Sequence, residues 1–225
     1  IVSSARAATV IARRWRERFD YIPDAIIVEG PLAGGHLGFK PEQIGEPAYA
    51  LEKLVPEVLA VVRELEQRHQ RRIPVIAAGG IYTGADIRRF LALGASGVQM
   101  ATRFVTTCEC DASDAFKQAY INAGEKDAVI IKSPVGMPGR ALRNQFTDDV
   151  EKGMKKPYKC SFHCISACDQ ENSPYCIAYA LLSARRGDFK HGFAFAGANA
   201  WRATEIVSVK DLVCTLREEY RQSAP

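Results

Sequence analysis

Apolar residues recur along this chain in short continuous runs that alternate with longer stretches of helical periodicity. Residues 5–19 carry apolar side chains at helical spacing, and residues 48–70 repeat that pattern, with Pro56 expected to bend the helix or to begin a new first turn. The short apolar runs 24–29 and 97–100 are typical of strands buried on both faces of a sheet. Further expected elements are a strand that opens at Pro74, helices over 84–93 and 113–123, a strand over 127–132, and helices over 173–185 and 208–221.

This alternation, with its short connections, predicts a parallel α/β sheet with right-handed crossovers. Both a (β/α)8 TIM barrel and a doubly wound sheet fit so regular a pattern. A barrel has eight strands and about 250 residues, whereas this chain shows the tail of one strand at Ile1-Val2 and then four complete strands. We therefore expect the C-terminal half of a TIM barrel over residues 1–140, and a mostly helical extension with a cysteine cluster and a closing helix over 141–225.

The composition is that of an ordinary globular protein, with 47% hydrophobic and 25% charged residues in a chain of 225. The net charge of +4 is mild, and the arginines at 13, 14, 16 and 18 fit a solvated helix face without the interleaved aromatic residues of a nucleic-acid surface. No apolar run reaches the roughly 18 residues of a membrane helix. Nucleic acid and membrane are thus not expected as partners.

Two further features concern the setting of the chain. It begins at Ile1 without an initiating methionine, so we expect an N-terminal part to be missing. Its seven cysteines are an odd number and accompany no secretory feature, which favours a reduced, cytoplasmic location.

Glycine or small polar residues directly follow three of the expected strands, as Gly34-Gly35-His36, Gly79-Gly80 and Ala101-Thr102. The active site of an α/β barrel lies at the C-terminal ends of its strands. Glycines there let backbone N–H groups approach a ligand, and N–H groups at a helix N-terminus bind anions. Because Gly79-Gly80 come just before the helix over 84–93, we expect a phosphate between adjacent loops. The alternative is that the glycines only make tight turns.

One histidine belongs to the first of these loops. The imidazole of His36 titrates near neutral pH and can take or give a proton, which makes it a candidate acid or base. The alternative is an ordinary exposed loop histidine.

Four cysteines follow the last expected strand as C-x3-C-x3-C-x7-C, at Cys160, Cys164, Cys168 and Cys176. On a helix the first three would share one face, and four thiolates can hold a zinc ion or an iron–sulfur cluster. The spacing differs from the usual C-x2-C of either site, so thiols that are merely reduced or buried remain the alternative. Cys214, in the last helix, is expected in the core.

The segments 30–39, 74–81 and 97–104, read as GPLAGGHLGF, PVIAAGGI and GVQMATRF, resemble in order and spacing the nitronate monooxygenase family, formerly called 2-nitropropane dioxygenase. Residues 140–144 and 196–200 also resemble family segments. This family includes the FMN-dependent enoyl-acyl-carrier-protein reductases II. The resemblance implies a TIM barrel that binds FMN noncovalently.

By motif matching, His36 corresponds to the catalytic histidine of the family, and the loop 191–199 to the segment that closes over the flavin. Ala101 stands where the family usually has glycine. The resemblance also implies flavin contacts from earlier strands, which this chain lacks. The matched flavin-lining residues are Gly34 and Gly35, and the matched residues for the FMN phosphate are Gly79, Gly80, Gln99, Met100, Ala101 and Thr102.

The function implied is FMN-dependent oxidation of a small molecule, a nitronate or nitroalkane, with dioxygen. His36 would remove the α-proton of the nitroalkane or orient the nitronate. One alternative on the same site is reduction of an enoyl thioester with NAD(P)H. An alternative of another class is a noncatalytic phosphate-ligand or metal-binding subunit of a split assembly. The oligomeric state, including a homodimer, stays open.

Overall fold

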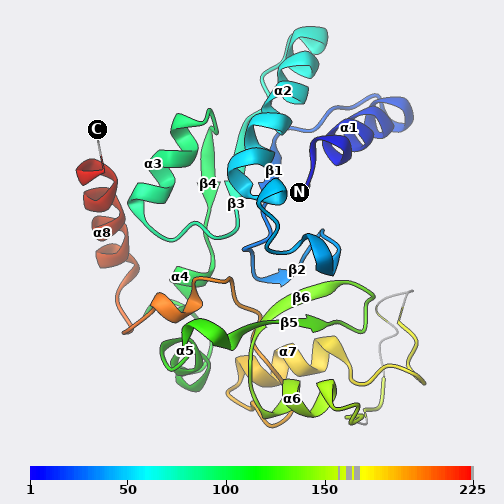
Figure 1. The fold of residues 1–225 in the computed structure, drawn as a ribbon, viewed down its shortest axis with the longest axis vertical. Coiled ribbons are helices and arrows are strands. Elements are labelled where there is room, and N and C mark those ends of the chain that lie inside the picture. Colours follow the sequence, from blue (N-terminus) through cyan, green and yellow to red (C-terminus); the bar gives the residue numbers. More distant parts are fainter. Residues whose placement is uncertain (157, 161–163, 165–167, 224–225) are drawn as a thin grey trace. The chain divides into compact units, whose positions relative to one another are not determined.

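The computed structural model describes residues 1–156, 158–160, 164 and 168–223 (Figure 1). The chain forms two compact units that interleave along the sequence. The first unit comprises Ile1–Ala33, Gly38–Ala101 and Lys210–Pro225, and the second comprises Gly34–Leu37 and Thr102–Val209. The sequence-based division at residue 140 stays a prediction.

The first unit contains a parallel three-stranded sheet in the order β1 (Ile26–Glu29), β3 (Val75–Ala78), β4 (Gly97–Gln99). Val2 forms an isolated parallel bridge to Val28 of β1. The register aligns the last residues of the three strands, because Glu29 pairs with Ala78 and Ala78 with Gln99. The loops that follow these strands therefore leave the sheet at one edge.

The helices of the first unit follow the predicted periodicity. Pro56 does not end α2, and Thr83 caps α3 with its hydroxyl oxygen. Gly94 ends that helix with a φ of +102°. The helices are α1 (Ala5–Phe19), α2 (Leu51–His69), α3 (Gly84–Ala92) and α8 (Val209–Gln222), with the 3-10 turns η1 (Pro41–Gln43) and η2 (Pro47–Tyr49).

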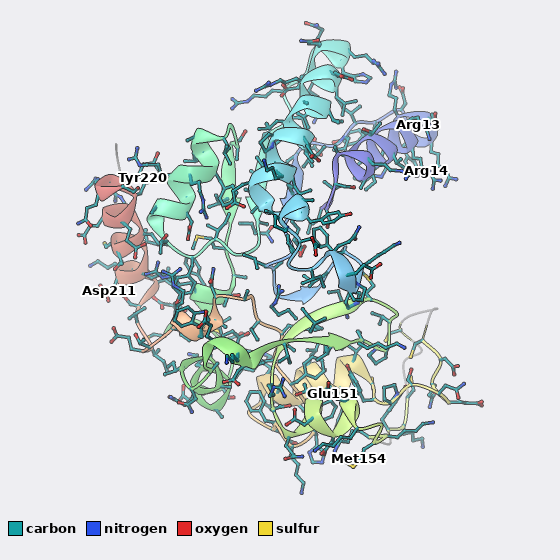
Figure 2. The ribbon with its side chains drawn as sticks, in the orientation of Figure 1. Arg13, Arg14, Glu151, Met154, Asp211 and Tyr220 are labelled. Carbon is teal, nitrogen blue, oxygen red and sulfur yellow. The ribbon has the colours of Figure 1, made fainter. Side chains whose placement is uncertain are left out.

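The helix surfaces match the sequence-based expectation for the basic residues. Arg13 and Arg14 on α1 are exposed (Figure 2), as solvated helix faces require. Among the helices that the structure describes, none is both long and apolar enough to cross a membrane.

The second unit has a different kind of sheet. It is antiparallel, in the order β2 (Gly35–His36), β6 (Pro138–Leu142), β5 (Ala128–Lys132) (Figure 1). The strand expected over 127–132 is therefore present, but its assignment to the parallel sheet is wrong. A tight turn after Lys132 reverses the chain, with Gly136 at a φ of +83°, and leaves no room for the crossover that a parallel neighbour needs.

The helices of the second unit are short, and β2, β6, α4 and α6 were not predicted. The helix expected from residue 173 begins only at Ile177. The elements are α4 (Thr102–Val105), α5 (Asp114–Ile121), η3 (Glu125–Asp127), α6 (Gln145–Glu151), α7 (Ile177–Arg185) and η4 (Ala200–Arg202).

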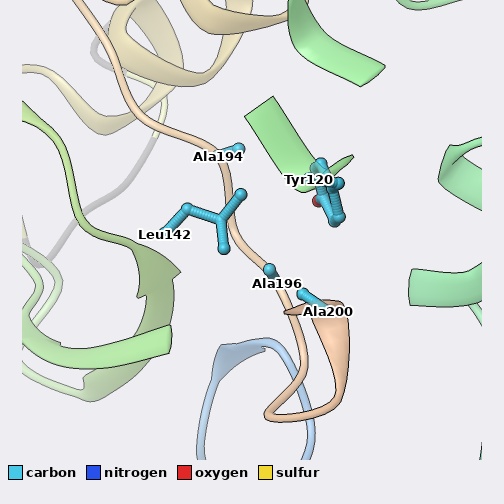
Figure 3. Close-up of a cluster of buried hydrophobic side chains, with 5 residues drawn as sticks. All are labelled: Tyr120, Leu142, Ala194, Ala196 and Ala200. Carbon is cyan, nitrogen blue, oxygen red and sulfur yellow. The ribbon is translucent and has the colours of Figure 1, made fainter. Parts of the chain in front are cut away.

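A core cluster of the second unit holds the segment that runs into η4. Tyr120 of α5 packs with Leu142 and three alanines of the late chain, Ala194, Ala196 and Ala200 (Figure 3). The Tyr120 hydroxyl also donates a hydrogen bond to the carbonyl of Phe195. Small side chains let this segment lie directly against the sheet, where Ala196 N–H donates to Arg140 O and Leu142 N–H to Ala194 O.

Candidate functional site

The predicted phosphate loops of the first unit lie next to each other. Gly79 and Gly80 follow β3, and Met100 and Ala101 follow the neighbouring strand β4. Because Ala78 pairs with Gln99 in parallel register, both loops begin at the same level of the sheet. The structure thus places Gly79, Gly80, Gln99, Met100 and Ala101 at one edge of the sheet, and their role in binding phosphate stays a prediction.

Packing against the first strand-end loop explains why Gly79 and Gly80 are glycines. Their φ angles are +91° and +79°, which L side chains rarely adopt. A Cβ at Gly79 would lie 2.9 Å from the carbonyl oxygen of Gly30, and one at Gly80 would lie 2.7 Å from the Cβ of Leu32. The chain itself therefore requires these glycines, so their presence alone is no sign of a phosphate.

The start of α3 is less open to an anion than the sequence suggested. The N–H groups of Tyr82 and Thr83 donate to Asp86 Oδ2 at 3.0 and 2.9 Å, and Gly84 N–H donates to Glu219 Oε2 at 2.7 Å. Burial opposes ionisation of Asp86, but the hydrogen bonds from Thr83 and Tyr82 hold its pKa below its usual value. The N–H groups at the start of α3 are therefore already engaged, and the loops after β3 and β4 remain as the predicted place for a phosphate.

Glu29 is a carboxyl group at this same edge that sequence reasoning did not single out. It ends β1 beside Ala78, and burial raises its pKa above the usual value. The sequence showed that Glu29 belongs to the expected strand over 24–29, but it did not show that the carboxyl group is partly buried.

In the second unit, the structure holds His36 from two sides. Its Nε2 lies 2.8 Å from the hydroxyl oxygen of Ser133, and its ring meets Phe195 edge-on, with centroids 5.0 Å apart at 68°. Burial lowers the pKa of His36 below its usual value of 6.5. His36 is thus a partly buried imidazole that is neutral at pH 7, and not the freely exposed loop histidine of the alternative interpretation.

Gly139 makes room for this arrangement. It pairs with His36 across the β2–β6 ladder, and a Cβ at this position would lie 2.9 Å from Phe195 Cε1. The absence of a side chain at Gly139 lets the Phe195 ring lie over the strand and touch the imidazole. No local pattern in the sequence indicates this contact, because Gly139 and Phe195 are far apart along the chain.

The segment 195–197 joins three of the predicted site residues. Phe195 contacts His36, a Cβ at Gly34 would lie 2.5 Å from the backbone of Ala196 and Gly197, and Gly197 N–H donates to Thr102 Oγ1 at 3.0 Å. The resemblance had indicated the loop 191–199 as part of the site. Within the second unit, Gly34, His36 and Thr102 surround one backbone segment.

The family assignment rests on the match over nearly the whole chain. A family model described as nitronate monooxygenase matches residues 1–219. The chain belongs to the nitronate monooxygenase family. A probable nitronate monooxygenase of Staphylococcus aureus (strain Newman) is 39% identical over 131 residues, which are 57% of this chain and 34% of that protein. The chain thus spans about a third of the length of this curated relative.

Two solved structures are similar over 99% of this chain. FabK from Thermotoga maritima has 28% identity and a TM-score of 0.71, with 60% of its own length covered. The nitroalkane oxidase from Streptomyces ansochromogenes has 26% identity and a TM-score of 0.64, with 56% covered. Both are TIM-barrel proteins, and this chain, an α/β fold with a parallel sheet, corresponds to part of them. The predicted family and fold class are confirmed.

The nine site residues matched to the family are divided between the two units. The chain passes from one unit to the other after Ala33, Leu37 and Ala101, so the matched motifs contain these junctions. Gly34, Gly35, His36 and Thr102 belong to the second unit, and Gly79, Gly80, Gln99, Met100 and Ala101 to the first.

A cavity of about 920 Å³ lies in the second unit, between β5, α6 and the residues before α7. Ser133 lies on its wall, together with the aromatic rings of Phe146, Tyr175 and Phe193. Phe193 also packs edge-on against Phe195. Ser133 and these rings therefore connect the surroundings of His36 with this cavity.

The cysteine cluster is only partly described. The structure assigns no helix to Cys160, Cys164 or Cys168, and the residues between them, with His163, lie outside the described ranges. Among the described residues, no three His, Cys, Asp or Glu side chains are grouped as a metal site needs. The tetrathiolate site stays a prediction. Cys214 is exposed on α8, so its expected core position is wrong.

Proposed function

We propose that this chain is part of an FMN-dependent oxidoreductase that oxidises nitronates and nitroalkanes with dioxygen, with His36 as the base. The observation that carries the proposal is the position of His36, which is partly buried and held between Ser133 and Phe195 in a chain of this family. A fixed, neutral imidazole is what proton abstraction from carbon requires.

The chemistry of His36 follows from its lowered pKa. Because burial keeps the imidazole neutral at pH 7, a ring nitrogen is free to accept the α-proton of a neutral nitroalkane. A nitronate is already an anion, so it needs no base, and the imidazole then has only to orient it. The two substrates therefore separate the role of His36 in proton transfer from its role in binding.

The residues present fit FMN in two places. A Cβ at Gly35, whose φ is +83°, would meet no atom within 4 Å, so this backbone borders space that a flat ring can approach. In the first unit, the loops at Gly79-Gly80 and Met100-Ala101 leave neighbouring strands at the same level of the sheet, and backbone groups of such loops can bind phosphate without carrying a charge. Bound FMN would accept electrons from the substrate anion and deliver them to dioxygen.

The first test is the visible absorption spectrum of the full-length protein, before and after denaturation, followed by oxygen uptake with nitroethane and with its nitronate. A two-band flavin spectrum that is released on denaturation, with oxygen uptake on the nitronate, supports the proposal. A colourless protein that does not take up added FMN contradicts it and favours the noncatalytic subunit. A further absorption that dithionite bleaches would indicate an iron–sulfur cluster on the cysteines.

A second function is favoured by the similarity to FabK from Thermotoga maritima, at a TM-score of 0.71. The family includes enoyl-acyl-carrier-protein reductases II, which would use the same site with NAD(P)H and an enoyl thioester. Consumption of NAD(P)H that depends on the enoyl thioester, without oxygen uptake on a nitronate, would replace the first proposal by this one. We also propose a cytoplasmic location and, as one possible oligomeric state, a homodimer.

A further inference from the structure

We propose that Ser133 is a positioning residue that holds His36 with the proton on Nε2 and leaves Nδ1 bare as the basic atom. This inference deepens the proposed function and rests on it, because a bare nitrogen matters only if His36 takes a proton. It assigns a role to a serine that no sequence motif indicated.

The hydroxyl of Ser133 has a fixed place. The residue directly follows β5, is 3% exposed, and begins the turn to β6. Its N–H donates to Met137 O at 3.1 Å, and its carbonyl accepts from Gly136 N–H at 3.0 Å. Val135 N–H points to the Ser133 hydroxyl oxygen at 3.4 Å. The turn therefore holds the hydroxyl oxygen from its own backbone, independently of His36.

The hydrogen-bond inventory then selects the tautomer. A neutral imidazole has one N–H donor and one bare acceptor nitrogen. Nε2 is engaged by Ser133 at 2.8 Å, so Nδ1 is the nitrogen left for a substrate. Nδ1 is bare only if Nε2 carries the proton, and Ser133 must then accept this hydrogen bond. Since Ser133 lines the 920 Å³ cavity, its own hydroxyl hydrogen has space to turn into.

The same contact fixes the orientation of the ring. Rotation of the imidazole by half a turn would place a carbon where Nε2 now meets Ser133, and the hydrogen bond would be lost. Phe195 touches the ring edge-on but is apolar, so it limits the space without distinguishing nitrogen from carbon. Ser133 is the residue, among those described around His36, that makes one orientation and one tautomer preferable.

The direct test is NMR of the full-length protein labelled with 15N-histidine, recorded above the pKa of His36. The chain has four histidines, and a His36→Asn variant assigns the resonance of interest. We expect a protonated Nε2 and a bare Nδ1 for His36, and a mixture of tautomers in Ser133→Ala. A protonated Nδ1 in the wild-type protein would overturn the inference. This result does not depend on whether the protein oxidises any nitro compound.

The kinetic test uses Ser133→Ala, with Ser133→Thr as the variant that keeps the hydroxyl. We expect Ser133→Ala to lower kcat for nitroethane about 10²-fold, to spare the nitronate, and to be partly rescued in Ser133→Thr. Ser183→Ala, another buried serine of the second unit, is the matched control and should change neither rate. Equal losses on both substrates would contradict the positioning role. Absence of nitronate oxidation in the wild-type protein would instead contradict the proposed function, and the NMR result would still decide the tautomer.

Discussion

The strand-end edge of the first unit and the surroundings of His36 in the second unit are built in different ways. At the start of α3 in the first unit, two backbone N–H groups are capped by a residue close in sequence, because Asp86 accepts from Tyr82 and Thr83. In the second unit, His36 is held by Ser133 and Phe195, which follow it by 97 and 159 residues. Local capping rules therefore account for part of the start of α3, whereas they give no information about the surroundings of His36.

This difference has a chemical consequence. The carboxylates of Asp86, in the first turn of α3, and of Glu219, from α8, occupy the start of α3 and make it less receptive to an anion. Distant partners that bury His36 shift its pKa and fix its ring, which prepares it for proton transfer. The predictions that follow test this contrast, from the largest expected effect to the smallest.

Removing the imidazole should have the largest effect. In His36→Ala, we expect kcat/KM for a neutral nitroalkane to fall about 10²- to 10⁴-fold, because general-base catalysis is lost, while oxidation of the preformed nitronate is largely kept. Oxygen uptake with both substrates measures this. His69→Ala is the control, since His69 ends α2 and lies outside every predicted site motif. An equal loss on both substrates would refute the base assignment.

In the first unit, the substitution Gly84→Ala separates tertiary packing from helix propensity. Propensity alone predicts that alanine in α3 stabilises. The structure predicts the opposite, because a Cβ would lie 2.1 Å from Leu216 O and 2.3 Å from Tyr220 N of α8. We expect a loss of about 2 kcal/mol in the free energy of unfolding, seen as a melting temperature lower by about 4–8 °C.

The matched control for this substitution is Gly97→Ala in the same unit. A Cβ there would meet Ile76 Cδ1 at 3.4 Å, an ordinary contact with the end of a flexible side chain. Gly97→Ala should therefore leave the melting temperature nearly unchanged. A higher melting temperature in Gly84→Ala would contradict the close packing of α8 against the start of α3.

Asp86→Asn should weaken the start of α3 by about 1 kcal/mol at pH 7, because the charged acceptor of two backbone N–H groups is lost. The folded pKa of Asp86 lies below its usual 3.8, so its contribution is present above that pH and disappears as the pH falls through the folded pKa. Urea unfolding at pH 7 and near pH 3 measures the difference between variant and wild type. Asp20→Asn, at an exposed ion pair with Arg16, should change little at either pH.

The smallest expected effect concerns the pH dependence of His36. Phe195→Leu reduces the burial of the imidazole, so its pKa should rise toward the usual 6.5. The acid limb of kcat/KM for the nitroalkane should then move to higher pH, since the base must be neutral. In the wild-type protein the lowered pKa also means that folding stability declines as the pH falls below 6.5. An NMR titration of His36 checks the direction, and a downward shift would contradict it.

Much of the first unit was predictable because its elements repeat locally. The periodicity of residues 5–19 predicted α1 correctly, and three strand-end motifs were enough to indicate the family. The antiparallel pairing of β5 with β6 was not predicted, because an apolar run of strand length does not indicate which strand will be its neighbour in the sheet. The prediction that Cys214 lies in the core was also wrong, because the amphipathic pattern of α8 does not determine where its buried face ends and its exposed face begins.

The sequence by itself determined the α/β class, the nitronate monooxygenase family and His36 as the candidate base. These properties are carried by side-chain periodicity and by short motifs that are contiguous in the chain. Only the tertiary structure decided that Glu219 of α8 occupies the start of α3, and that Ser133, Phe195 and the space left by Gly139 hold the imidazole. Such contacts join residues whose separation is set by how the whole chain folds, and burial, which shifts the pKa of His36, exists only once they have formed.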